Sequence, residues 1–525
     1  MSETDLSSIH KALIGFDKRA ERTSDEILEA TFVDSAPLFD LLSSKNNQVI
    51  YGRRGTGKTH ALKYLARYVE KASERPIYID LRSVGSNGSI YSDGSRPLAE
   101  RASTLVLDVL NAIFGELYVL AVEALDKALD PDQVTLRLDD YSKAIQSVRI
   151  TGTIETESQQ GTSWSEENNF GLNLDQRATP SLTVALGSKT GNGANSSART
   201  RRTGNEKIHL NFGNIGSSLS GLISVVGVSR IWLLIDEWSE VPFDLQPYLA
   251  NLFRRTVLPI GSITLKVASI EHRSVFSISK DKGEYIGLEL GADIAADLNL
   301  DDFLVFDNNQ SKSTEFFKNP LFKHYSNSDK AIPELNSADR LIQVAFTQVP
   351  VFEEFVRAVE GVPRDALNLA AKVATKAYGQ TIAAQHVRSA ARDWYQQDKQ
   401  AVIRSNKGLH DLLIDDIIGK RRARAFLFPS NFRNTLIDKL FDARLLHILK
   451  KNVSTHDEPG VRYDVYKIDY GCYVDLINTA KMPKGLFEAE EDGADPAFVE
   501  VPKDDYRSIR RAILHPDKLQ VALTV

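Results

Sequence analysis

The pattern of apolar and polar positions divides the chain into segments of different secondary structure. Residues 1–45 carry apolar side chains at helical spacing, which predicts an amphipathic helical lead-in. Apolar runs predict buried strands at Gln48–Tyr51 and at 75–84, with a helix from Thr59 to about Lys71 between them. Because buried strands alternate with helices, the pattern predicts a parallel sheet.

The same pattern continues further along the chain. Residues 97–130 are almost continuously apolar but contain acidic side chains, which predicts a buried helix rather than a membrane span. Residues 229–236 and 262–270 return to the pattern of buried strands. Residues 335–400 show helical periodicity. The chain is therefore expected to hold a sheet-containing core followed by a helical region.

The composition changes between residues 151 and 205, which are rich in Gly, Ser, Thr and Asn. A flexible linker is one interpretation of this stretch. Short alternating pieces at 148–156 and 182–190 have strand period and instead predict a β-rich insertion, bounded at about 140–220. Long surface insertions cost a fold little, so we expect the insertion to lie outside the core.

Composition and charge are those of a globular protein with several domains. The hydrophobic fraction is 42% and the charged fraction 26%, and 525 residues exceed what one hydrophobic core holds. The single cysteine, Cys472, cannot form an internal disulfide and fits a reducing compartment, so a cytoplasmic protein is expected. The sequence has no run of eighteen apolar residues, so no membrane partner is expected. The net charge of −6 argues against nucleic-acid binding over the whole protein surface but permits a local basic surface.

A glycine-rich turn follows the first predicted strand. Residues 52–59 read GRRGTGKT and match the phosphate-binding pattern GxxxxGK[ST]. Glycines let backbone N–H groups turn inward around phosphate oxygens, and the next helix adds the positive end of its dipole. Lys58 is expected to reach the β- and γ-phosphates and Thr59 to ligate Mg²⁺. The predicted nucleotide-binding residues here are Gly52, Arg53, Arg54, Gly55, Thr56, Gly57, Lys58, Thr59 and His60, with helix packing as the competing interpretation of His60.

A second buried strand ends in two acidic residues, Asp236 and Glu237. Mg²⁺ prefers carboxylate oxygens, and the carboxyl ends of strands border the ligand site in open α/β sheets. We therefore expect Asp236 to bind Mg²⁺ together with Thr59, and Glu237 to polarise the water that attacks the γ-phosphate. Ser269, at the end of the next strand, is the first candidate for a contact with that phosphate or water, and Glu271 is the second.

A later helix supplies a candidate arginine. Residues 361–374 read GVPRDALNLAAKVA, with Pro363 near the helix start, where proline is favoured. Arg364 is expected to reach the γ-phosphate from this helix. The competing interpretation is an ordinary solvated arginine, so the assignment depends on the other motifs.

The order of these parts resembles the AAA+ ATPases, and within them the bacterial relatives of the origin-recognition-complex and cell-division-control initiator ATPases. The resemblance covers roughly residues 20–480, and its motifs are ATFVD at 30–34, YGRRGTGKTH at 51–60, LLIDEWSEVPFDLQPYLANLFRR at 233–255, KVASIEHRS at 266–274 and GVPRDALNLA at 361–370. It implies that Phe32 and Val33 flank the adenine and that Arg364 is the sensor arginine of a helical lid. It also implies an arginine finger from a neighbouring subunit, for which Arg254, Arg255 and Arg273 compete.

A basic segment lies near the C-terminus. Residues 417–451 contain nine Lys or Arg and two Asp, and residues 463–476 alternate like a β-hairpin. Helices followed by a hairpin resemble the winged helix of initiator ATPases, whose cations neutralise DNA phosphates. The predicted DNA-binding residues are Lys420, Arg421, Arg422 and Arg424. Docking of a protein by the same module is the alternative.

Together these observations predict an α/β protein with a parallel-sheet AAA+ P-loop NTPase core, a helical lid, a β-rich insertion and a C-terminal winged helix. The expected domains are a lead-in at 1–45, an ATPase core at 46–330 that includes the insertion, a lid at 331–405, a winged helix at 406–485 and an acidic tail at 486–525. The expected function is binding and slow hydrolysis of ATP with Mg²⁺. The nucleotide state would control DNA binding or assembly into a homo-oligomer, in bacterial anti-phage defence. The alternative is a regulatory ATP switch that docks a protein such as an effector nuclease.

Overall fold

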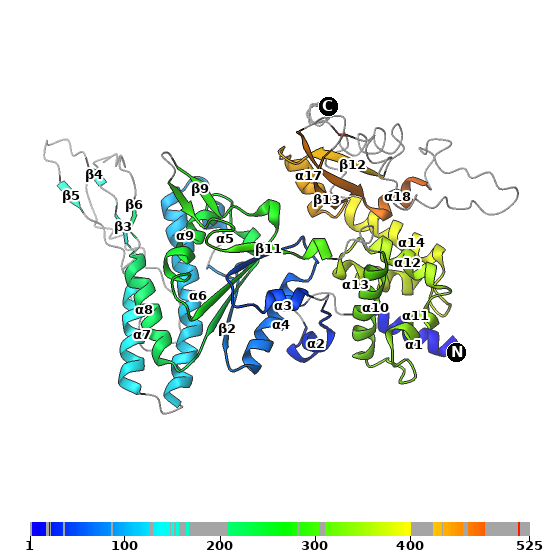
Figure 1. Cartoon of the computed structure of the whole chain (residues 1–525), viewed down its shortest axis with the longest axis horizontal. Helices are drawn as coiled ribbons and strands as arrows, with labels where there is room; N and C mark the ends of the chain where they lie inside the picture. Colours follow the sequence, from blue (N-terminus) through cyan, green and yellow to red (C-terminus); the bar gives the residue numbers. More distant parts are fainter. Residues whose placement is uncertain are drawn as a thin grey trace, which may run out of the picture. The chain divides into compact units, whose positions relative to one another are not determined.

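The structure is a computed structural model of the chain (Figure 1). It describes residues 3–16, 20, 23–34, 37–85, 88–126, 130–146, 149–151, 154–156, 164–166, 207–209, 211–280, 284–303, 310–400, 424–432, 434–454, 460–477 and 513–514. Contacts divide the chain into two compact units. Unit 1 comprises Met1–Ser43, Tyr51–Tyr64 and Asn299–Val525, and unit 2 comprises Ser44–Ile50 and Leu65–Leu298.

A five-stranded sheet forms the core of unit 2. Its strands are β1 (Gln48–Tyr51), β2 (Arg75–Asp80), β7 (Ile231–Asp236), β8 (Ile263–Ser269) and β11 (Ala295–Asn299). The strand order is β11-β1-β8-β7-β2, and β7 runs parallel to both β2 and β8. Every residue of β7 and β8 is buried, as expected for strands covered on both faces. The parallel α/β sheet is therefore confirmed, and β8 lies between the strand before the glycine-rich turn and the strand that ends at Asp236.

Helices pack beside this sheet (Figure 1). They are α5 (Gly88–Ser92), α6 (Leu98–Asp126), α7 (Pro131–Gln146), α8 (Phe212–Val225) and α9 (Gln246–Thr256). Among the described helices, α6 has the length and composition of a membrane span, with a mean hydropathy of 1.9 over its most apolar window. Because 44% of that window is buried and α6 packs on α7 and α9, α6 also fits the buried helix predicted at 97–130.

Short strands occur where the β-rich insertion was predicted. The antiparallel pairs are β3 (Arg149–Thr151) with β6 (Lys207–His209) and β4 (Ile154–Thr156) with β5 (Trp164–Glu166). The last turns of α7 lie at the start of the predicted range 140–220, and the first turns of α8 lie at its end. The alternating piece at 182–190 lies outside the described residues. A further pair, β9 (Ser277–Ser279) with β10 (Tyr285–Gly287), follows β8.

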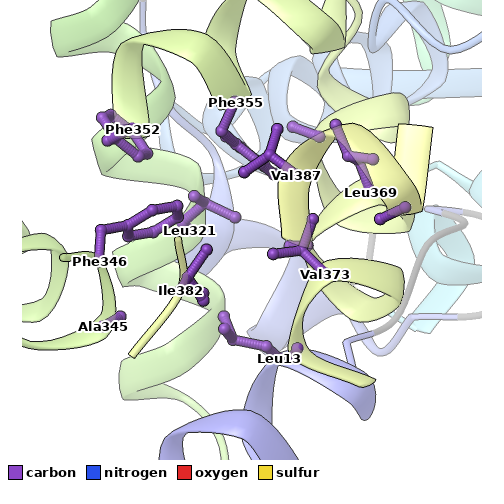
Figure 2. Packing of buried hydrophobic residues seen from close by; sticks show 14 of the residues in the cluster. Leu13, Leu321, Ala345, Phe346, Phe352, Phe355, Leu369, Val373, Ile382 and Val387 are labelled. Atoms are coloured by element: carbon purple, nitrogen blue, oxygen red, sulfur yellow. The ribbon is translucent and has the colours of Figure 1, made fainter. Parts of the chain in front are cut away.

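Unit 1 contains a helical core. Its helices are α1 (Glu3–Ile14), α2 (Asp25–Thr31), α3 (Leu38–Leu42), α10 (Gln310–Ser326), α11 (Ala338–Ala345), α12 (Val349–Val359), α13 (Pro363–Lys376), α14 (Ala384–Trp394) and the short turns η5 (Leu300–Phe303) and η6 (Tyr395–Lys399). Figure 2 shows Leu13 of α1 in the same buried cluster as Leu321, Phe355 and Val373 of the later helices. The helices predicted at 335–400 are confirmed. Helix α1 joins their core, although the sequence suggested a separate lead-in.

Residues 424–477 form a winged-helix module in the described part of unit 1. Its elements are β12 (Ala425–Pro429), α17 (Thr435–Asp442), β13 (Leu446–Ser454), β14 (Arg462–Ile468) and α18 (Tyr470–Ile477). The antiparallel sheet has the order β12-β14-β13. The predicted hairpin at 463–476 is wrong, because β14 pairs with β13 and residue 470 begins a helix. That helix packs closely on α14, where any side chain at Gly471 would collide with the carbonyl of Ala391.

Candidate nucleotide-binding site

The glycine-rich turn that follows β1 is the P-loop of unit 1, and it leads into α4 (Lys58–Lys71). Gly55 and Gly57 have φ angles of +94° and +98°, a region that side-chain-bearing residues rarely adopt. The Thr56 hydroxyl donates to the carbonyl oxygen of Arg53 at 2.9 Å and closes the turn. The backbone of this loop therefore requires the glycines that the motif provides.

The Lys58 ammonium group is held inside the curve of the P-loop. Its Nζ donates to the carbonyl oxygens of Gly52 at 2.6 Å and of Arg53 at 3.1 Å, and the residue is buried. Lys58 also begins α4, whose first-turn N–H groups attract anions. A phosphate in this loop would meet a cation and a helix N-terminus together, which is the environment that the motif predicts.

The P-loop packs on the start of α13, where Arg364 lies. The Arg364 N–H donates to the carbonyl oxygen of Gly55 at 3.1 Å. A β-carbon at Gly55 would lie 3.0 Å from Arg364 Nε and 3.0 Å from Val362 Cγ1. The fold thus places Arg364 next to the P-loop. Its contact with the γ-phosphate stays a prediction.

Aromatic rings pack around Phe32, at the end of α2. Phe32 stacks on Tyr64 with ring centroids 3.9 Å apart and meets the His60 ring edge-on at 5.5 Å. His60 Nε2 lies 2.7 Å from the carbonyl oxygen of Leu28, and burial lowers the pKa of His60. His60 therefore links α4 to α2, which is the helix-packing interpretation. The adenine contacts of Phe32 and its neighbour Val33 stay a prediction.

In unit 2 the end of β7 carries the two acidic residues. Asp236 is fully buried, and its carboxylate accepts hydrogen bonds from the Tyr78 hydroxyl at 2.7 Å and the Glu237 N–H at 2.8 Å. Burial and the Asp236 charge raise the pKa of Tyr78, so Tyr78 remains a donor. A carboxylate offers about four lone pairs, so Asp236 retains acceptor capacity for a cation.

Glu237 has an unusual backbone conformation and a cationic neighbour. Its φ angle is +56°, which is uncommon outside glycine and is found at functional sites. Its carboxylate lies 3.5 Å from Arg82 Nη1, and the same guanidinium binds Asp80 at 2.6 Å. Arg82 follows β2 without any motif, so nothing in the local sequence marked it as a neighbour of Glu237.

Ser269 lies at the end of β8 in a network of hydroxyl groups. Its Oγ is 3.1 Å from Ser239 Oγ and hydrogen-bonds with Ser274 Oγ. Ser274 Oγ donates to the Ile270 carbonyl at 2.6 Å, and Ser239 Oγ accepts from the Ile270 N–H at 2.8 Å. The Ser269 hydroxyl is buried and has protein partners. Its predicted contact with phosphate or water remains untested.

The side chain of Arg53, one of the predicted nucleotide-binding residues, contacts other groups of the protein. Its Nε lies 2.8 Å from Asp301, its Nη2 donates to the carbonyl of Glu360 at 2.8 Å, and its Nη1 lies 2.5 Å from His447 Nδ1. The side chain is buried, whereas the adjacent Arg54 is exposed. Arg53 therefore contributes its main chain to the P-loop and directs its guanidinium toward later parts of unit 1.

The structure also corrects one of the four predicted DNA contacts. Arg424 is buried, forms an ion pair with Glu360, and donates through Nε to the carbonyl of Ile468 at 2.9 Å. A guanidinium with these partners is not available to DNA phosphates. Lys420, Arg421 and Arg422 lie outside the described residues, so their role stays a prediction.

Comparison with known families supports the resemblance seen in the motifs. A family model described as ORC-CDC6-like matches residues 16–168, which include Phe32 and the whole P-loop. Over this range the chain is similar to the ORC-CDC6-like family. The ORC-CDC6-like segment covers the predicted adenine and phosphate contacts, but it ends before Asp236, Arg364 and the winged-helix module. No curated protein matches the chain at a significant level.

Solved structures resemble the chain along most of its length but only loosely. The Walker-type ATPase PABY2304 of Pyrococcus abyssi is 14% identical, with 88% of this chain and 99% of that chain covered and a TM-score of 0.39. The ORC1 protein of Aeropyrum pernix, solved in complex with DNA, is 12% identical, with coverage of 85% and 91% and a TM-score of 0.30. CDC6p from Pyrobaculum aerophilum is 12% identical, with coverage of 85% and 94% and a TM-score of 0.28.

Proposed function

We propose that the chain binds ATP with Mg²⁺ and hydrolyses it slowly. The observation that carries the proposal is the P-loop itself, in which Lys58 lies within the curve of the loop and Gly55 packs on the helix start that bears Arg364. The match to an ORC-CDC6-like family, over a range that includes the P-loop, also supports nucleotide binding. In this proposal Lys58 and Arg364 stabilise the negative charge of the phosphates.

The remaining site residues have complementary chemistry. Thr59 and Asp236 would hold Mg²⁺, which neutralises phosphate charge, and the donor set of one hydroxyl and one carboxylate fits a hard cation. Glu237 would accept a proton from the attacking water, and Ser269 would orient that water or the γ-phosphate. The rings near Phe32 and Val33 would border the adenine.

A lysine substitution tests this proposal directly. Lys58→Ala should abolish ATP binding or weaken it severely, because it removes the cation that faces the phosphates. The measurement is a titration of the purified full chain with a fluorescent ATP analogue. Lys71→Ala is a matched control, since Lys71 is an exposed lysine at the other end of the same helix. Wild-type affinity in Lys58→Ala would overturn the proposed nucleotide site.

We further propose that the nucleotide state controls DNA binding through the winged-helix module, or assembly of a homo-oligomer. DNA binding should weaken steeply with salt, by a slope of about −0.9 for each neutralised phosphate. Reversing Lys420, Arg421 and Arg422 to glutamate should remove DNA binding and leave ATP binding intact, with a thermal melt as the folding control. Mass photometry with and without ATP would measure assembly.

The alternative is a switch that docks a protein partner, such as an effector nuclease, without binding DNA. The burial of Arg424 and the net charge of −6 favour this alternative, because both reduce the positive charge available to a duplex. Failure of the wild-type chain to shift duplex DNA at low salt with ATP would favour protein docking. A cytoplasmic location and a role in anti-phage defence remain predictions, and genes encoded beside this one would test the latter.

A further inference from the structure

The side chain of Arg53 connects the P-loop to three other elements of unit 1. Asp301 in η5 accepts from the Arg53 backbone N–H at 2.8 Å and forms an ion pair with Arg53 Nε. Glu360 follows the end of α12, and His447 lies in β13 of the winged-helix module. A single P-loop residue is thus held by groups from the lid and from the winged-helix module.

Two cationic side chains form ion pairs with Glu360, whose carbonyl oxygen contacts Arg53. Its backbone has a φ angle of +56°, and its side chain is 3% exposed. The carboxylate forms ion pairs with Arg424 and, at 2.6 Å, with Lys467 Nζ, both in the winged-helix module. Its carbonyl oxygen accepts from Arg53. Glu360 therefore joins the lid to the P-loop through its main chain and to the winged-helix module through its side chain.

His447 has the protonation state that an acceptor for Arg53 requires. Burial and the nearby Arg53 charge lower the pKa of His447 to about 4, so the imidazole is neutral at pH 7. Its Nδ1 then offers a lone pair to the guanidinium, while Nε2 faces Asp469 Oδ1 at 3.4 Å. Asp469 forms a buried ion pair with Lys399 at 2.5 Å. The imidazole is thus oriented by partners on both of its nitrogens.

The main chain of Arg53 links these contacts to the phosphate-binding groups. Its carbonyl oxygen accepts from Lys58 Nζ at 3.1 Å and from Thr56 Oγ1 at 2.9 Å. The side chain and the main chain of one residue therefore join the winged-helix module to the lysine expected to bind phosphate.

We propose that Arg53 is a positioning residue through which His447 of the winged-helix module sets the shape of the P-loop, so that docking of this module and binding of ATP are coupled. The proposal rests on the proposed function, because it takes the P-loop as an ATP site. Coupling of this kind is reciprocal: if the docked module changes ATP affinity, ATP changes module docking by the same factor. An arginine exposed to solvent at this position, without contacts to the winged-helix module, would not couple ATP binding to docking of that module.

A matched pair of substitutions at His447 tests the coupling. His447→Asn keeps a neutral acceptor near the position of Nδ1, whereas His447→Leu removes the acceptor at similar volume. In the full chain, His447→Leu should change the Kd for ATP by about fivefold or more. It should also abolish the effect of ATP on hydrogen exchange in β13 and β14. His447→Asn should stay near wild type in both measurements.

A purely structural role gives a different result. If His447→Leu raises exchange in β13 and β14 but leaves the Kd for ATP unchanged, His447 only stabilises the module and the proposal is wrong. Equal ATP affinity in the Leu and Asn variants, with wild-type exchange in both, would also overturn it.

A second pair of variants tests the same link from the P-loop. Arg53→Gln should raise exchange in β13 and β14 by about tenfold, because His447 and Glu360 lose a buried partner. Arg54→Gln removes the same charge from the exposed neighbour and should leave that exchange unchanged. If the wild-type protein does not bind ATP, the proposed function is wrong. The hydrogen exchange of Arg53→Gln would still decide whether the P-loop and the winged-helix module are linked. Equal exchange in both arginine variants would overturn the link.

Discussion

Substitution of one P-loop glycine should show how tightly the loop packs on the lid helix. At Gly55, alanine would adopt a φ angle of +94°, which costs a side-chain-bearing residue roughly 1–2 kcal/mol. Its β-carbon would also lie 3.0 Å from Arg364 Nε and Val362 Cγ1 and 3.2 Å from Arg364 Cβ. Overpacking of this kind adds about 1–3 kcal/mol. We therefore expect Gly55→Ala to destabilise unit 1 by about 2–5 kcal/mol.

Gly57→Ala is the matched control for this prediction. Its φ angle of +98° imposes nearly the same backbone cost, but a β-carbon there would meet no atom within 4 Å. The difference between the two variants isolates the contact with α13, and it should appear as a lower melting temperature for Gly55→Ala. At about 2–4 °C per kcal/mol, a gap of at least about 2 °C is expected in thermal melts of the full chain. Equal melting temperatures would refute the close packing of Gly55 on Arg364 and Val362.

Two further predictions concern hydrolysis and pH. Glu237→Gln should retain ATP binding but slow phosphate release at saturating ATP by about 10²–10⁴, since the amide keeps the shape and loses the proton acceptor; unchanged turnover would place the base elsewhere. Stability of the winged-helix module should fall as the pH drops from 6.5 toward 4. In that window the unfolded chain protonates His447, whereas the folded chain, with a His447 pKa of about 4, does not. Urea denaturation of wild type and His447→Asn across this range checks the prediction, and identical pH dependence in both would contradict it.

Several elements of the fold were predictable because their signals are local. The apolar runs before the P-loop and before Asp236 identified β1 and β7, since buried parallel strands need no polar face. The hairpin error at 463–476 has a local cause as well. The alternating pattern continues past Asp469, yet Asp469 Oδ2 accepts from the Cys472 N–H at 3.2 Å, as the cap of α18. In this segment the N-cap residue indicates the start of a helix, whereas the alternating pattern wrongly indicates a strand.

Arg53 and Arg54 have different environments that the local sequence does not predict. They are adjacent, have the same charge and belong to the same motif, yet one is buried and the other exposed. The difference arises from the acceptors that the fold supplies to Arg53, of which His447 is 394 positions away along the chain. No local pattern marks such a partner. The motif therefore predicts what binds at the P-loop, because that chemistry is carried by eight consecutive residues. The part of the protein that responds to bound nucleotide depends on contacts between residues far apart in the sequence, such as Arg53 and His447. Only the folded chain reveals these contacts.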